Sequence, residues 1–205
     1  MLTLIQSGGV HRIDMATPRF HVIDIAGVRR ALPLAQVGPG LSIAVLNILG
    51  DTALVQAAAR ALAARLASVA YDVIMTAEAK SIPLAHALSV ETTRPYIVLR
   101  KSYKSYMGDA LRATTLSITT GHEQTLFLDA KDRSQLAGQR VVLLDDVIST
   151  GSTLQGLRSI AERAGAAIAT VAAICTEGDP GQWEGVIALA HLPLFREPAA
   201  EGPPV

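Results

Sequence analysis

From residue 41 onward, short apolar runs alternate with stretches in which apolar residues recur every three or four positions. Leu54, Ala58 and Leu62 have the spacing of one face of a helix, and Asp51 or Thr52 would cap its first turn. Short continuous apolar runs are instead typical of buried strands. The pattern predicts three helices, at residues 52–68, 82–88 and 153–164.

The continuous apolar runs predict the strands that lie between these helices. Buried strands are predicted at residues 42–48, 71–76, 95–99, 140–144 and 167–175. Residues 114–119 and 124–128 favour an antiparallel pair joined by a turn. Because strands and helices alternate from residue 42 to 175, we expect an α/β fold with a parallel sheet covered by helices on both faces. Such sheets bind ligands beyond the carboxyl ends of their strands.

The two ends of the chain have weaker patterns. In residues 1–40, short apolar pieces are interrupted by Gly and Pro, and we assign no helix or strand there. Residues 197–205 are rich in Pro and Gly and are expected to form a loose tail. No internal repeat or linker stands out, so we predict a single domain over residues 1–205.

Composition and charge narrow the class of protein. The 18 basic and 18 acidic residues balance, which argues against a broad nucleic-acid-binding face. The longest apolar run, residues 41–50, is too short to cross a bilayer, and the N-terminus lacks a secretion signal. The single cysteine, Cys175, rules out an internal disulfide. We therefore expect a cytoplasmic protein with no membrane or nucleic-acid partner.

The most informative segment is residues 141–153, which reads VVLLDDVISTGST. Asp145 and Asp146 follow a predicted strand, and a loop of small and hydroxyl residues then leads into a helix. The N–H groups of such a loop bind anions in the positive field of the helix. Two carboxylates beside a phosphate suit a ligand that carries hydroxyls or a metal there, such as a ribose 5-phosphate. The alternative is an ordinary strand–turn–helix in which an Asp caps the helix.

This segment resembles the phosphoribosyl pyrophosphate (PRPP) signature of the type I phosphoribosyltransferases. Their pattern is four hydrophobic residues, two acidic residues, and a short loop around a Thr-Gly pair. The resemblance implies that Asp145 and Asp146 hold the ribose 2- and 3-hydroxyls. It also implies that the 5-phosphate binds to the residues of the loop, which are Ser149, Thr150, Gly151, Ser152 and Thr153.

The resemblance also implies how the rest of the chain is organised. The parallel-sheet core would span about residues 42–176. A small hood over the base would come from the chain ends, at about residues 1–40 and 177–196.

A second segment is similar to the pyrophosphate loop of adenine phosphoribosyltransferases, which reads Glu-Ala-Arg-Gly. Here the four residues are Glu78, Ala79, Lys80 and Ser81. Lys80 loses the bidentate geometry of an arginine, and Ser81 has less backbone freedom than a glycine. The resemblance implies pyrophosphate binding at this loop. An ordinary helix entrance with Ser81 as its cap is the alternative reading.

A third segment is a basic loop that begins with an Arg-Lys pair, as the mobile loops of the adenine, xanthine and orotate enzymes do. The resemblance implies that Arg100 and Lys101 bind pyrophosphate and that Lys104 assists catalysis. Such a loop would stabilise the leaving anion and keep water from an oxocarbenium-like transition state. A solvated surface loop is the alternative.

The residues that would select the base point in different directions. Hypoxanthine/guanine enzymes usually have an Asp where this chain has Ser149, which argues against that branch. Adenine enzymes place a Glu at the end of the mobile loop. Here Thr119 takes that place, and Glu123 could substitute as a catalytic residue. Residues 117–125 also resemble the xanthine enzymes, so the base stays open.

Together these features imply a Mg2+-dependent purine phosphoribosyltransferase of the adenine or xanthine type, acting on PRPP and a free nucleobase. It would release pyrophosphate and form a nucleoside 5-monophosphate, as a homodimer. Asp145 and Asp146 would act on the metal through water, because Mg2+ retains several water ligands. An orotate-type pyrimidine enzyme and a non-catalytic PRPP-binding regulator remain alternatives.

Overall fold

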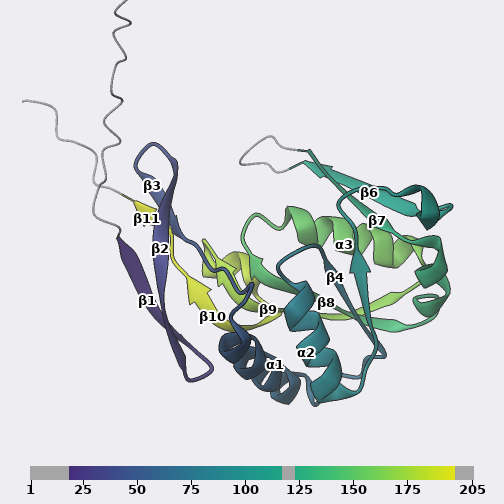
Figure 1. Cartoon of the computed structure of the whole chain (residues 1–205), viewed down its shortest axis with the longest axis horizontal. Helices are drawn as coiled ribbons and strands as arrows, with labels where there is room; N and C mark the ends of the chain where they lie inside the picture. The colour runs from purple at the N-terminus through teal and green to yellow at the C-terminus, as the bar shows by residue number, and fades with distance from the viewer. Residues whose placement is uncertain (1–18, 117–122, 197–205) are drawn as a thin grey trace, which may run out of the picture.

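The centre of the protein is a five-stranded parallel sheet, seen in a computed structural model that describes residues 19–116 and 123–196 (Figure 1). The strand order is β10-β9-β8-β4-β5, and each neighbouring pair is parallel. The strands are β4 (Val73–Ala77), β5 (Tyr96–Leu99), β8 (Arg140–Ile148), β9 (Ala167–Glu177) and β10 (Val186–Leu192). The predicted parallel sheet is confirmed.

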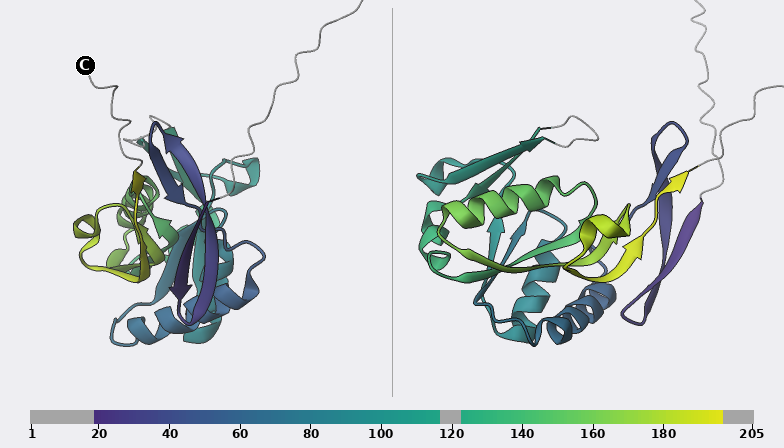
Figure 2. Two further views of the ribbon diagram at one scale, coloured as in Figure 1. Left: turned by 90° about the vertical axis from the view of Figure 1, so that its left-hand side faces the viewer. Right: turned by 180° about the vertical axis from the view of Figure 1, so that it is seen from behind.

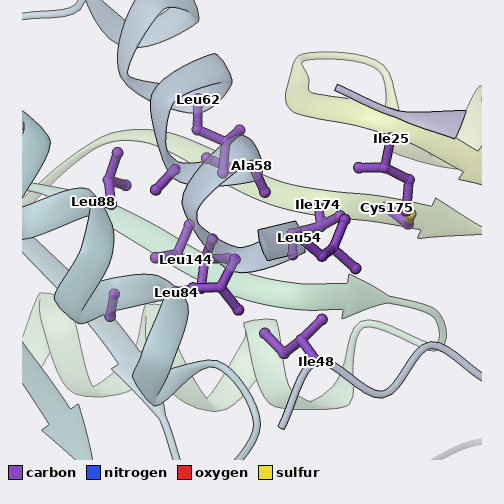
Figure 3. Packing of buried hydrophobic residues seen from close by; sticks show 14 of the residues in the cluster. Ile25, Ile48, Leu54, Ala58, Leu62, Leu84, Leu88, Leu144, Ile174 and Cys175 are labelled. Atoms are coloured by element: carbon purple, nitrogen blue, oxygen red, sulfur yellow. The ribbon is translucent and has the colours of Figure 1, made fainter. Parts of the chain in front are cut away.

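Helices cover both faces of this sheet, as predicted (Figure 2). The helices are α1 (Thr52–Leu66), α2 (Ile82–Thr92) and α3 (Ser152–Arg163). Successive side chains of a strand point to opposite faces, so Leu144 packs with α1 and α2, whereas Leu143 packs on the side of α3. Leu144 belongs to the same buried cluster as Leu54 of α1 and Leu84 of α2 (Figure 3).

A four-stranded antiparallel sheet stands beside α1 and β10 (Figures 1 and 2). Its order is β1-β2-β3-β11, from β1 (Phe20–Ile25), β2 (Val28–Gly38), β3 (Leu41–Ala44) and β11 (Phe195–Arg196). We call this sheet the hood. Its strands β1 and β2 were not predicted, because they join through Ala26 and Gly27, both at positive φ, and Ala-Gly is not a usual signal for such a turn.

The hood differs from the expectation in two further ways. The strand predicted at 42–48 ends at Ala44, and the chain then runs without regular structure to the start of α1. Residues 177–196 were assigned to the hood, but β10 pairs with β9 in the parallel sheet and only β11 joins the hood. The physical reason is that the largely apolar β10 gains backbone partners by extending a sheet edge.

The hood and the core are held together by apolar and charged contacts. Ile25 of the hood belongs to the same buried cluster as Leu54 and Leu62 of α1 (Figure 3). Asp51 accepts the Leu54 N–H at 3.2 Å, which confirms Asp51 as the cap of α1. The same carboxylate pairs with Arg30 of β2 at 2.7 Å, and this contact lowers the pKa of Asp51.

The predicted antiparallel pair is present as β6 (Leu111–Leu116) and β7 (Glu123–Leu128). This hairpin packs on α3, where Gly156 lets Leu126 approach closely, since a Cβ at Gly156 would lie 2.8 Å from Leu126 Cδ1. The residues between the two strands, Thr119 among them, and the predicted tail at 197–205 lie outside the described residues. Within the described parts of the chain, no helix is long and apolar enough to cross a membrane.

Candidate active site

Two adjoining cavities open at the carboxyl ends of β4, β8 and β9. The smaller, of about 80 Å³, is lined by Asp145 and by the run from Val147 to Leu154. The larger, of about 570 Å³, adds residues of the hood, of the loop after β4, and of the end of β9. Asp145 and Ser149 line both cavities, so they lie where the two meet.

The smaller cavity is formed by the turn between β8 and α3. Gly151 has a φ of +77°, which side chains rarely adopt, and a Cβ there would lie 3.0 Å from the ring of Trp183. The first two residues of α3, Ser152 and Thr153, line this cavity, so it lies at the helix N-terminus, where the field of the helix favours an anion. The structure thus brings together the five residues that the sequence predicted for phosphate, namely Ser149, Thr150, Gly151, Ser152 and Thr153.

The two acids lie at the end of β8, and Ser81 links them. The Ser81 hydroxyl lies 2.7 Å from Asp145 Oδ1 and 3.0 Å from Asp146 Oδ1, and it accepts the Asp146 N–H at 2.9 Å. A hydroxyl has one proton, so it donates to one of the two carboxylates at a time. Ser81 is the N-cap residue of α2, and its carbonyl accepts the Ala85 N–H at 2.9 Å, but its side chain makes no capping hydrogen bond and contacts the two acids instead.

The electrostatics of this pair favour one negative charge over two. Burial, and then the negative charge of Asp146, raise the pKa of Asp145 to about 7. The hydrogen bond from Ser81 acts in the opposite direction. A ligand that donates hydrogen bonds to both acids would therefore stabilise the doubly ionised pair.

The loop after β4 contacts the start of the basic loop through Glu78. This carboxylate accepts the Lys101 N–H at 2.7 Å and forms an ion pair with Arg100, which raises the pKa of Arg100. Glu78 therefore holds the two loops side by side. The peptide bond between Glu78 and Ala79 is cis. The five residues of these loops that line the larger cavity are Glu78, Ala79, Lys80, Ser81 and Lys101.

Two predicted catalytic residues are not brought to either cavity. Lys104 is exposed, and its N–H donates to Met107 Sδ at 3.3 Å. Glu123 is exposed at the start of β7, opposite Leu116. The neighbouring Gln124 reaches the phosphate loop instead, and its Oε1 accepts from Thr153 Oγ1 at 3.3 Å.

The far wall of the larger cavity contains residues that the sequence analysis missed. Ile43 and Leu46 supply an apolar surface from β3 and the segment after it. Glu177 supplies a carboxylate that is only 5% exposed and accepts from Ser149 Oγ at 2.6 Å. Its place at the end of a buried strand of a parallel sheet was the available signal.

Comparison with known proteins identifies the family. Residues 45–185 match the model of the phosphoribosyl transferase domain, and this chain belongs to that family. The resemblance to the type I phosphoribosyltransferases and the α/β fold class, both inferred from the sequence, are confirmed.

Curated relatives of the chain carry a common name. The hypoxanthine/guanine phosphoribosyltransferase of Methanococcus voltae is 37% identical over 109 residues, which cover 53% of this chain and 54% of that protein. The enzyme of the same name from Methanocella paludicola is 35% identical over 108 residues, with 53% of each chain covered. The chain spans about half the length of the curated relatives it matches.

Solved structures resemble the fold at low sequence identity. The adenine phosphoribosyltransferase of Thermoanaerobacter pseudethanolicus has a TM-score of 0.65 at 20% identity, covering 78% of this chain and 95% of that chain. The Giardia lamblia enzyme complexed with 9-deazaadenine also has a TM-score of 0.65, at 19% identity, covering 84% of this chain and 93% of that chain. At such identities the likeness concerns the fold alone.

Proposed function

We propose that this chain is a purine phosphoribosyltransferase, which transfers 5-phosphoribose from PRPP to a ring nitrogen of a free purine and releases pyrophosphate. The observation that carries the proposal is the junction of the two cavities, where Asp145 and Asp146 meet an amide-lined turn of the kind that binds phosphate. The family match and the names of the relatives support the same reaction.

The ribose 5-phosphate would lie across this junction. Its phosphate would accept hydrogen bonds from the first amides of α3 and from the hydroxyls of Thr150, Ser152 and Thr153, because the Ser149 hydroxyl already donates to Glu177. Its 2- and 3-hydroxyls would donate to Asp145 and Asp146, which are charged acceptors and therefore strong ones. This placement directs the anomeric carbon into the larger cavity, between the pyrophosphate loops and the hood.

Pyrophosphate would bind where two lysines face the larger cavity. Lys80 and Lys101 both line it, and Lys80 Nζ lies 3.4 Å from the carbonyl oxygen of Leu46. Their positive charge would stabilise the leaving anion. The hood and the basic loop would keep water away from the reacting carbon, since an oxocarbenium-like centre is readily captured by water.

Mg2+ fits this donor set through ligand oxygens and water. Among the described residues, no three His, Cys, Asp or Glu side chains come together in a group that could hold a metal ion by themselves. Two carboxylates at Asp145 and Asp146 are enough for an ion that keeps several waters and binds substrate phosphates. The ion would neutralise charge on the pyrophosphate.

The choice of purine is the finer part of the proposal. The Arg-Lys pair of the basic loop resembles the adenine, xanthine and orotate enzymes, whereas the relatives at 35–37% identity are named for hypoxanthine and guanine. The test is to incubate the protein with PRPP, Mg2+ and one of five bases: adenine, xanthine, hypoxanthine, guanine or orotate. The products to measure are pyrophosphate and the nucleotide. We expect turnover of at least one purine. Turnover of orotate alone, or PRPP binding without any turnover, would contradict the proposal.

The role of the acids is tested by Asp145→Asn combined with Asp146→Asn. We expect PRPP affinity, measured by calorimetry, to fall about 100-fold, because two hydrogen bonds to charged groups of about 1.5–3 kcal/mol each are weakened. Asp72→Asn is the matched control, because Asp72 pairs with Arg140 at the opposite end of β8. Unchanged affinity in the double variant would remove the acids from the ribose site.

A further inference from the structure

The hydrogen bond between Ser149 and Glu177 has no part in the binding scheme above. Ile148 of β8 lies opposite Thr176 of β9 in the parallel register, so the next residues along the two strands are Ser149 and Glu177. Their side chains meet at 2.6 Å between Ser149 Oγ and Glu177 Oε1. Ser149 is exposed to the cavities, whereas Glu177 is 5% exposed beneath it. A buried carboxylate is thus connected to the ligand space through one hydroxyl.

The direction of this hydrogen bond determines what Ser149 can offer a ligand. An ionised carboxylate only accepts, so the single hydroxyl proton of Ser149 is donated to Glu177. The remaining lone pairs of Ser149 Oγ can then only accept. A ligand group placed against Ser149 must therefore carry a proton, as the imidazole N–H of a free purine does.

The other charged groups of the larger cavity lie toward its ribose and pyrophosphate parts. They are Glu78, Lys80, Lys101, Asp145 and Asp146. On the side of β10, His191 is occupied by hydrogen bonds to Thr176 Oγ1 at 3.0 Å and to the Gly178 carbonyl at 3.1 Å. No other hydrogen bond to the Glu177 carboxylate comes from the described residues. Within residues 19–116 and 123–196, none of the ion pairs involves Glu177.

We propose that Ser149 and Glu177 form a proton relay for the purine, an inference that rests on the proposed function. The purine nitrogen forms a bond to the anomeric carbon, and the bond from that carbon to pyrophosphate breaks with its electron pair on the pyrophosphate oxygen. The imidazole N–H proton passes to Ser149 Oγ as the proton of Ser149 passes to Glu177 Oε1. Glu177 ends as a neutral acid and later releases its proton to water in the opened cavity.

The relay also resolves a conflict between the sequence and the relatives. Ser149 stands where hypoxanthine/guanine enzymes usually have an Asp, and on that ground it argued against such bases. Glu177 supplies the carboxylate one hydroxyl further away. In this relay Ser149 is the catalytic residue, and Glu177 is a positioning residue that acts through it.

The test begins with Glu177→Gln, which keeps the size of the side chain but cannot take up a proton. We expect kcat to fall about 100-fold, as is usual when a general base is lost. PRPP affinity by calorimetry, the KM for the purine and the melting temperature should stay unchanged, so that the loss is confined to kcat. A merely structural role would lower the melting temperature and change KM together with kcat.

Ser149→Ala keeps the proposal falsifiable if Glu177→Gln folds poorly, because it interrupts the same relay and leaves Glu177 in place. Ser149→Ala should lower kcat as much as Glu177→Gln does, and the double variant should be no slower than either single one, because the two residues act as a unit. Ser149→Asp with Glu177→Gln moves the carboxylate to position 149 and should recover at least about 10-fold in kcat. Additive losses, or no recovery, would overturn the relay. If the wild type turns over a purine but the variants do not behave in this way, only the relay fails. If the wild type turns over no purine, the proposed function fails too.

Discussion

The phosphate end and the base end of the candidate site are built in different ways. The smaller cavity is lined by one nearly continuous run, Asp145 with the residues from Val147 to Leu154. The larger cavity takes its lining from the hood, the loop after β4, the basic loop and the end of β9, over more than a hundred residues of chain. In the proposed function, binding of the phosphate would therefore be a local property of one strand–turn–helix, whereas binding of the base would depend on how distant elements pack.

The two ends also differ in the chemical groups that they present to a ligand. The phosphate end offers amides and hydroxyls to a group that every PRPP-dependent reaction shares. The base end combines the apolar Ile43 and Leu46 with the single polar pair of Ser149 and Glu177. Substitutions at one end should consequently affect PRPP, and substitutions at the other should affect the base, with Asp145 between them.

The largest effect is expected from Gly151→Ala at the phosphate end. The new Cβ would sit at a strained φ of +77° and 3.0 Å from Trp183 Cη2, so the turn or the Trp183 ring must shift. We expect PRPP affinity, measured by calorimetry, to fall about 10- to 100-fold. The substitution strains the turn by about 1–3 kcal/mol, and a strained turn would no longer hold its amides in place for the phosphate.

Gly138→Ala is the matched control for this substitution. Gly138 has a φ of +73°, and a Cβ added there would have nothing within 4 Å, so the substitution carries the same backbone penalty away from the cavities. Both variants should lose similar stability, and only Gly151→Ala should lose PRPP affinity. Equal PRPP affinities in the two variants would show that the turn does not bind the phosphate.

A smaller effect is expected from the pH dependence of stability at Asp145, where the two ends meet. The folded protein raises the pKa of Asp145 to about 7, so the native state holds this proton more tightly than the unfolded chain does. Stability is therefore lost as the pH rises from about 4 to about 7. Asp145→Asn should be more stable than the wild type at pH 8, by about 1–2 kcal/mol in urea unfolding, and should lose this advantage near pH 4.

Asp72 offers a contrast of opposite sign. Hydrogen bonds from Arg140 hold the pKa of Asp72 well below its usual range, so its stabilisation is present at neutral pH and is lost on acidification. Asp72→Asn should thus be less stable than the wild type at pH 8. If Asp145→Asn and Asp72→Asn changed stability in the same direction there, the proposed electrostatics of the acid pair would be wrong.

The smallest effect is expected at the apolar wall of the base end. Ile43→Ala should raise the KM for the purine by roughly 3- to 10-fold and leave PRPP affinity unchanged, since about 1 kcal/mol of apolar contact with the base is lost. Leu34→Ala is the control, because Leu34 belongs to the same sheet, opposite Ala44, and does not line the cavity. A loss of PRPP affinity in Ile43→Ala would show that this apolar wall contacts PRPP and not the base.

The run from Val141 to Thr153 could be interpreted from the sequence because its chemistry is local. A buried strand, two acids and a hydroxyl-rich turn must lie side by side when they follow one another along the chain. The same holds for the three helices and for the alternation that predicted the parallel sheet, because each depends on spacing within one element. These features were in place before any contact between distant residues was known.

The hood and the base end could not be obtained in this way. The strands β1 and β2 have only half-buried faces, and β10 joins the parallel sheet through a backbone edge that no side-chain pattern reveals. Lys104 and Glu123 were chosen by position along a loop, yet neither lines a described cavity. Ser81 was assigned to pyrophosphate, with a helix cap as the alternative, and only the packing of β4 against β8 brings its hydroxyl between the acids.

The order of residues was enough to establish the parallel α/β fold, the family, and the turn at the end of β8 that can bind a phosphate. The packing of distant elements was needed to show which side chains line the larger cavity together, because Ile43, Ser149 and Glu177 come from three separate strands or strand ends. Pairing between neighbouring strands fixes their register, and with it the contact between Ser149 and Glu177. Ser149 and Glu177 are 28 positions apart in the chain, and this backbone pairing holds them within hydrogen-bond distance.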